Sequence, residues 1–232
     1  MSKKIAILQS NYIPWKGYFD LINSVDEFIL YDDMQFTRRD WRNRNKIKSR
    51  EGLLWLTIPV KAKGKYFQAI KDTEVNNRGW VYKHWNSIFH CYGKAKYFDL
   101  YRERFENLFI NAKASFLSEV NYLFLTAICD ILNITTKVSW SMDYKLLKEG
   151  RTERLIDLCK QADGVEYISG PTAKGYIDED MFRESGLHLS YMDYSDYPEY
   201  EQLYPPFCHQ VSVIDLIFNE GPSAKKYMKS FR

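Results

Sequence analysis

The chain has 232 residues, of which 45% are hydrophobic, so it is long enough to bury one large core. Positive charges exceed negative ones by only three, which argues against broad electrostatic binding to nucleic acid or to a membrane surface. No segment reaches the roughly 18 consecutive apolar residues that a membrane-spanning helix needs, so we expect no membrane span. The 18 Tyr, 14 Phe and 6 Trp suit a core, a sugar-binding face, base stacking or an interface.

The cysteines and histidines predict no dedicated metal site. The four cysteines are far apart in sequence, with no C-x-x-C, and the chain has no H-x-x-x-H or H-E-x-x-H motif. We therefore expect four free thiols. Free thiols and the lack of a recognisable secretion signal predict a reducing, cytoplasmic location.

The first 31 residues predict a strand, a helix and a second strand. Residues 5–8 and 28–31 are short apolar runs, typical of buried parallel strands, and residues 15–23 have the apolar spacing of a helix. A strand–helix–strand unit of this length is the building block of a parallel sheet.

The middle of the chain departs from this pattern. Residues 35–50 are polar and strongly basic and predict a loop, residues 53–60 predict a strand, and residues 69–75 predict a further strand at the surface. Helical spacing then predicts three helices, at residues 80–92, 97–109 and 116–132.

After residue 132 the alternation of strands and helices returns. Strands are predicted at residues 136–140, 165–168 and 187–191. Helices are predicted at residues 152–161, 178–185 and 211–219, with a last helical turn at 224–228. The predicted fold class is α/β, an open, mostly parallel, Rossmann-like sheet flanked by helices. Residues 1–232 then form a single domain with a helical insertion at about residues 80–132, and a split into two domains near Asn133 is the alternative.

The segment from Gln9 to Phe19 follows the first predicted strand and opens the first predicted helix. Ligands of open α/β sheets bind at this edge, and the N–H groups of a helix N-terminus favour anions. Gln9 and Asn11 place two amides there that serve no obvious purpose in a core. Gly17 would permit close approach of a ligand or of neighbouring backbone. The alternative is a plain turn between strand and helix.

Asp32 and Asp33 end the second predicted strand, beside the first motif. Because adjacent side chains point to opposite sides of a strand, we expect one of the two carboxylates to face the crevice. That carboxylate could act as a general base, bind an amine or a sugar hydroxyl, or hold Mg²⁺. The alternative is a solvated strand end.

Residues 37–48 contain four Arg, two Lys and two Asn around Trp41. Arg side chains bind phosphate through paired hydrogen bonds, and a basic run with an aromatic residue is also typical of nucleic-acid loops. The low net charge favours a local phosphate clamp, with Arg42 and Arg44, for a nucleotide or nucleotide sugar. A solvated basic loop is the alternative.

Residues 167–177 combine a strand end with a loop that carries Lys174. Ser169 and the loop amides could cradle an oxyanion, with Lys174 as a point charge. The spacing of a Walker A loop is absent. His209 lies just before the last long predicted helix and could line a pocket.

Several of these segments together resemble the WbqC-like family. The matching pieces are residues 7–19, Asp32-Asp33-x-Gln35-Phe36, Trp41-x-Asn43-Arg44-Asn45, Trp55-Leu56-Thr57-x-Pro59-Val60, Ser169-Gly170-Pro171 and Ser212-Val213-Ile214-Asp215-Leu216-x-Phe218-Asn219. They cover nearly the whole chain. Ser10 stands where the family usually has Pro, and Leu8 where it usually has His, so any role of that His is absent here.

The resemblance implies a function in surface-polysaccharide biosynthesis. The family is associated with O-antigen, that is lipopolysaccharide, gene clusters, and some members are described as glycine transferases. A fainter likeness, to pantothenate synthetase and its nucleotidyltransferase relatives, lies in the order of strand, turn, glycine and helix. In those enzymes a His-x-Gly-His motif holds the nucleotide, and the corresponding stretch here, Trp15-Lys16-Gly17-Tyr18, lacks both histidines.

Three functions follow as hypotheses. The first is a transferase that forms an amide between an amino acid or small acyl group and an amino sugar, in which an aspartate deprotonates the amine and a tryptophan stacks on a sugar or base. The second is a nucleotide-dependent, adenylating ligase that uses ATP and Mg²⁺. The third is a non-enzymatic nucleic-acid-binding module.

The candidate site follows from these motifs. Its catalytic residues are Gln9, Asn11, Asp32 and Asp33. Its substrate-binding residues are Trp15, Gly17, Tyr18, Gln35, Trp41, Arg42, Asn43, Arg44, Asn45, Ser169, Gly170, Lys174 and His209. The expected partner is a small phosphorylated molecule or nucleotide sugar, with ATP and Mg²⁺ as candidate cofactors.

Overall fold

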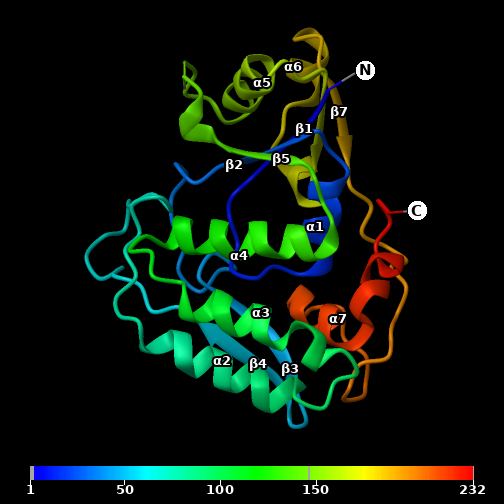
Figure 1. The fold of residues 1–232 in the computed structure, drawn as a ribbon. Coiled ribbons are helices and arrows are strands. Elements are labelled where there is room, and N and C mark those ends of the chain that lie inside the picture. Colours follow the sequence, from blue (N-terminus) through cyan, green and yellow to red (C-terminus); the bar gives the residue numbers. More distant parts are fainter. Residues whose placement is uncertain (1–2, 146, 232) are drawn as a thin grey trace.

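The computed structural model describes residues 3–145 and 147–231. Five parallel strands form one open sheet in the order β5–β2–β1–β6–β7 (Figure 1). These strands are β1 (Lys4–Leu8), β2 (Glu27–Leu30), β5 (Lys137–Trp140), β6 (Glu166–Ser169) and β7 (His188–Tyr191). The fold is therefore mixed α/β with a parallel sheet, as the sequence predicts.

Helices cover both faces of this sheet. Helices α1 (Lys16–Asn23) and α4 (Leu117–Leu132) pack on one face, and α5 (Arg151–Gln161) and α6 (Glu179–Glu184) pack on the other. Side chains of a strand alternate between faces, so Ala6 packs with the first pair of helices and Ile5 with the second. Both faces of β1 and β2 are thus buried, which explains why these strands read as continuous apolar runs.

A second layer lies beyond α4 (Figure 1). It consists of the antiparallel hairpin β3 (Arg44–Ser49) and β4 (Gly52–Thr57), with the helices α2 (Gly79–Tyr92), α3 (Phe98–Ile110) and α7 (Val213–Glu220). The 3₁₀ helices η1 (Ser141–Asp143), η2 (Pro171–Gly175) and η3 (Gly221–Tyr227) complete the described elements. None of the helices in the described ranges is long and apolar enough to cross a membrane.

Two predictions from the sequence are wrong in this second layer. Residues 44–49 form strand β3, where the sequence predicts a loop, because the polar Asn45 and Lys48 are buried and bonded internally. Residues 69–75 form no strand and make only isolated bridges, at Ala69 and at Glu74 and Val75. Their backbone N–H groups instead donate to carbonyls of a neighbouring loop, as Lys71 does to the Asp32 carbonyl.

The sheet opens between β1 and β6. These two strands pair at only two positions, Lys4 with Glu166 and Ile5 with Tyr167, whereas the other parallel pairs run for four residues. The chain leaves β1 toward β2 but leaves β6 toward β7, so strand order reverses here. The carboxyl ends of strands at such a point form the ligand crevice of open α/β sheets.

Candidate functional site

A cavity of about 680 Å³ occupies this crevice. It lies within the size range of about 300–1,000 Å³ that small-molecule sites show. Its lining comes from the ends of β1 and β6, from the starts of α1 and α5 and from the segments that connect strands and helices: Ile7, Leu8, Gln9, Asn11, Trp15, Tyr18, Tyr31, Met34, Glu149, Arg151, Arg154, Leu155, Tyr167, Ser169, Gly170, Pro171, Thr172, Ala173, Tyr176 and Tyr194.

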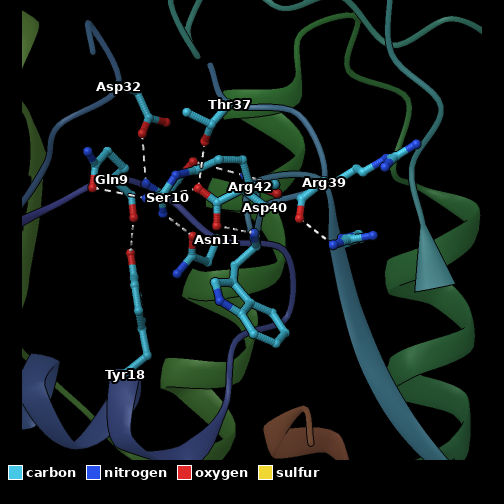
Figure 2. Close-up of polar contacts among 12 residues, drawn as sticks. Gln9, Ser10, Asn11, Tyr18, Asp32, Thr37, Arg39, Asp40 and Arg42 are labelled. Carbon is cyan, nitrogen blue, oxygen red and sulfur yellow. Dashed lines mark hydrogen bonds and ion pairs between the residues drawn. The ribbon is translucent and has the colours of Figure 1, made fainter. Parts of the chain in front are cut away.

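The Arg42 side chain joins the two amides that the sequence singles out. Figure 2 shows its guanidinium between Gln9 and Asn11, where it donates to Asn11 Oδ1 and, over 3.2 Å, to Gln9 Oε1. A guanidinium has donors only, so both amide oxygens must face it. The amide nitrogens Nε2 of Gln9 and Nδ2 of Asn11 have no partner among the described residues. The cavity wall therefore offers two oriented hydrogen-bond donors.

Asp32 lies behind this wall and does not line the cavity. Its buried carboxylate accepts a hydrogen bond from the Ser10 backbone N–H over 2.7 Å and another from Ser118 Oγ of α4. Asn121, one turn along α4, donates to Ser10 Oγ and to the Arg42 carbonyl, both over 2.9 Å. Burial raises the pKa of Asp32, and the hydrogen bonds from Ser118 and Ser10 offset part of that rise. Asp32 thus fixes the loop that carries Gln9 and Asn11.

Asp33 points to the opposite side of the strand end, as expected for adjacent residues. Its carboxylate accepts hydrogen bonds from Ser141 and from Arg154, with which it forms an ion pair. Neither aspartate therefore faces the crevice, which corrects the expectation that one of them would. Asp33 instead orients Arg154, whose guanidinium also lies 5.4 Å from the centre of the Tyr31 ring.

Two cavity residues that the sequence reasoning missed are Arg151 and Arg154. They lie in the first turn of α5, directly after its N-cap Gly150. A cation at a helix N-terminus opposes the helix dipole, at a cost of about 0.3–1 kcal/mol. Two arginines there are therefore a signal for anion binding that sequence alone could have given. Glu149 is the single carboxylate in the described lining of the cavity.

Aromatic side chains form the remaining wall. Trp15 packs edge-on against Tyr194, with ring centres 5.1 Å apart. A Cβ on Gly17 would lie 2.3 Å from the Trp15 ring, so Gly17 makes room for that indole. Tyr18 is buried and donates to the Gln9 carbonyl over 2.9 Å. Burial raises the pKa of Tyr31 to about 12, so this phenol stays neutral and can donate a hydrogen bond.

Most of the basic segment is engaged with the protein itself. Asn43 donates to the Ile58 carbonyl, and Asn45 donates to the carbonyls of Tyr12 and Ile13. Arg44 donates to the Arg39 carbonyl and stacks on Trp55, with 4.1 Å between the guanidinium carbon and the ring centre. Neither Asn43 nor Arg44 lines the cavity.

Of the other expected site residues, some line the cavity and others lie outside it. Ser169 and Gly170 line the cavity. Lys174 is exposed and lies over the Tyr191 ring, and His209 packs edge-on against Phe207. Gln35 is exposed and donates to the Tyr66 carbonyl. Trp41 lies outside the cavity but lines a second, smaller one.

Metal binding has little support from the described side chains. They contain no group of three or more His, Cys, Asp or Glu residues that could hold a metal ion. Asp33, whose partner Arg154 lines the cavity, is committed to Arg154 and Ser141.

Comparison with known proteins gives two matches. The model of the WbqC-like protein family matches residues 9–227. A protein of Mycobacterium tuberculosis (strain ATCC 25618 / H37Rv), named uncharacterized protein Rv1507c, is 46% identical over 230 residues, which cover 99% of each chain. No solved structure matches.

Proposed function

The chain belongs to the WbqC-like protein family, and from that premise we propose that it is a transferase that joins an amino acid or small acyl group to an amino sugar in surface-polysaccharide biosynthesis. The observation that carries the proposal is the set of residues that line the cavity of about 680 Å³. It combines two arginines, two oriented amide donors and one carboxylate at the crevice of a parallel sheet.

The arginines suit a phosphorylated substrate, such as a nucleotide-linked one. Arg151 makes no hydrogen bond or ion pair with a described residue, so its donors are available to a ligand. Arg154 is held in place by Asp33, and the remaining donors of its guanidinium can bind the same phosphate. The first backbone N–H groups of α5 add a favourable dipole for an anion.

The amide donors suit an acyl group. When an amine attacks an acyl carbon, negative charge develops on the carbonyl oxygen, and fixed donors stabilise that charge. Nε2 of Gln9 and Nδ2 of Asn11 are such donors, because Arg42 holds both amides in one orientation. The new C–N bond forms as the bond to the leaving group breaks, and the leaving group departs with the electron pair.

The proton of the attacking amine needs an acceptor. Asp32 is buried away from the cavity, and Asp33 is ion-paired, so we assign this role to Glu149 instead. Glu149 lies two residues before Arg151 in the chain and lines the same cavity. Glu149→Gln should therefore lower turnover by at least about 100-fold, which is the usual contribution of a general base.

A ligand panel with matched arginine variants tests the proposal. Thermal-shift measurements with UDP-, dTDP- and GDP-sugars, with ATP and Mg²⁺, with CoA and with single-stranded RNA identify the ligand class, since a ligand at 100 times its Kd adds about 2.7 kcal/mol of stability. Arg151→Ala should then weaken the phosphorylated ligand at least about tenfold in calorimetric titration, through the loss of one or two charge-assisted hydrogen bonds.

Arg44→Ala is the control for Arg151→Ala, because Arg44 is an arginine that stacks on Trp55 and lies outside the cavity. Its affinity for the same ligand should stay within about twofold of wild type. A loss of affinity in Arg44→Ala with none in Arg151→Ala would overturn the phosphate assignment. Stabilisation by ATP with Mg²⁺ alone would favour the adenylating ligase, and by RNA alone the nucleic-acid module.

A further inference from the structure

A second cavity, of about 320 Å³, adjoins the first one. The two cavities share Asn11 and Trp15 in their walls. The rest of the second cavity is lined by Pro14, Trp41, Asn45 and Gln210. No charged side chain occurs in its described lining, in contrast to Glu149, Arg151 and Arg154 in the first cavity. The two cavities therefore suit different chemical groups.

The second cavity combines flat apolar faces with amides. The indoles of Trp15 and Trp41 offer faces on which a ring can stack. Nδ2 of Asn11 is a free donor, and the amide of Gln210, which is exposed, has no partner among the described residues. Asn45 is different, because its amide bonds to the carbonyls of Tyr12 and Ile13 and its oxygen to the Lys46 N–H.

Both indoles are held before a ligand arrives. The Trp41 carbonyl accepts from the Tyr12 N–H over 3.0 Å, and its ring lies 5.5 Å from that of Trp55. The Trp15 ring packs against Tyr194 on one side and directly over Gly17 on another. A fixed stacking face costs little further ordering when a ligand binds.

We propose that the second cavity binds the pyranose ring of an amino sugar, with the ring stacked on Trp41. This inference rests on the proposed function, in which the amino sugar is the acceptor. The lack of charged lining disfavours phosphate and carboxylate groups, while hydroxyls can bond to the amides of Asn11 and Gln210. Asn11 lies at the border of both cavities, so a sugar bound here would lie next to the acyl group in the first cavity.

The test is saturation-transfer NMR with glucosamine and N-acetylglucosamine at millimolar concentration. Trp41→Ala should weaken sugar binding at least about fivefold. Tyr82→Ala is the control, because Tyr82 is an exposed aromatic residue of α2 that lines neither cavity. Tyr82→Ala should stay within about twofold of wild type. Gln210→Ala, at an exposed position, gives a second variant that should lower affinity severalfold even if Trp41→Ala folds poorly.

Inorganic pyrophosphate separates this inference from the proposed function. It should bind the first cavity without displacing the sugar, and Arg151→Ala should weaken pyrophosphate while sugar binding is retained. Competition between the two ligands, equal losses in Tyr82→Ala and Trp41→Ala, or no sugar binding to the wild type would each overturn the inference. Sugar binding that depends on Trp41, in a protein that binds no phosphorylated compound, would support the second cavity and refute the proposed function alone.

Discussion

The parallel sheet and the hairpin layer are stabilised by different interactions, although helix α4 packs against both (Figure 1). The central strands of the sheet are mostly apolar: Ile5, Ile29 and Leu30 are fully buried, and the buried Glu27 stands at the start of β2. The hairpin layer buries polar groups as well, and these groups are bonded to one another.

The centre of that polar network is Asp215 of α7. Its carboxylate accepts hydrogen bonds from Tyr92 over 2.8 Å, from Tyr200 over 2.7 Å and from Gln202 over 2.9 Å. Gln202 in turn accepts from the buried ammonium of Lys48 in β3 over 2.6 Å. One carboxylate thus connects α2, α7, the hairpin and the loop that precedes α7. Buried polar groups stabilise only when each has its partner.

The two regions should therefore respond to different mutations. In the sheet, loss of packing is the main risk, as for Ile29→Ala, which should cost about 2–5 kcal/mol. In the hairpin layer, loss of a single acceptor leaves several donors unsatisfied.

Asp215→Ala should destabilise the protein by about 3–5 kcal/mol, because Tyr92, Tyr200 and Gln202 lose their common acceptor in a buried place. Burial raises the pKa of Asp215, and hydrogen bonds from Tyr200 and Tyr92 oppose that rise, so the neutral isostere should be tolerated better. Asp215→Asn should cost about 1–2 kcal/mol. Urea unfolding followed by circular dichroism measures both. Equal costs for the two variants, or less than about 1 kcal/mol for Asp215→Ala, would refute the network account.

The same contrast explains what could be predicted from the sequence. The parallel strands and the long helices were predicted within a few residues, because burial on both faces leaves apolar runs and helical packing leaves an apolar stripe. Strand β3 was missed because its buried positions include Asn45 and Lys48, whose partners come from distant segments such as Tyr12 and Gln202. Sequence periodicity records which positions are apolar and not which polar residues find partners.

The candidate site shows a similar limit. The strand-end rule located the cavity and the two amides, Gln9 and Asn11, that line it. The rule failed for Asp32, which it placed in the crevice. The Asp32 carboxylate instead lies behind the cavity wall and accepts a hydrogen bond from Ser118 of α4, more than 80 residues away in the chain. The rule also did not identify Arg154, because it considers only strand ends, whereas the signal of Arg151 and Arg154 lies at the start of a helix.

Glu27 provides a pH-dependent probe of the sheet region. It is fully buried at the start of β2, and burial opposes its ionisation, but hydrogen bonds from Lys3, Ser139, Tyr144 and Lys137 outweigh this effect and lower its pKa to about 2. A folded pKa below the unfolded value stabilises the protein above about pH 4.5, and this stabilisation, on the order of 3 kcal/mol, is lost as the pH falls toward 2.

Glu27→Gln should therefore be less stable than wild type at pH 7, and the gap should close as the pH falls from 4.5 toward 2. Denaturant unfolding at several pH values measures this difference in the free energy of unfolding. Asp215 should show the opposite pH dependence, because its pKa is raised in the folded state. Its contribution to stability therefore grows as the pH falls toward its unfolded pKa near 3.8. A gap between Glu27→Gln and wild type that does not change with pH would show that Glu27 acts by packing alone.

The smallest expected effect is a difference in opening free energy between the sheet and the hairpin layer, which should unfold together. Strands β1 and β2 contribute to both apolar clusters, with Phe28 packed toward α1 and α4, and Ile29 packed toward α5. Separation of the regions would therefore expose a strand face of the same sheet. This argues for one cooperative unit and against the two-domain alternative.

The free cysteines report on this directly, since Cys91 and Cys129 lie in the cluster shared with the hairpin layer and Cys159 lies in the α5 cluster. All three are buried, and burial raises the pKa of Cys91 to about 11 and those of Cys129 and Cys159 to about 12, so they react only after opening. Labelling with N-ethylmaleimide at pH 8, read by peptide mass spectrometry, should modify the partly exposed Cys208 first. Cys91, Cys129 and Cys159 should be labelled more slowly. Their labelling rates should give one and the same opening free energy, equal to that of global unfolding. A lower opening free energy at Cys159 than at Cys91 would show that the α5 side opens on its own, and the sheet would then belong to a separate unit.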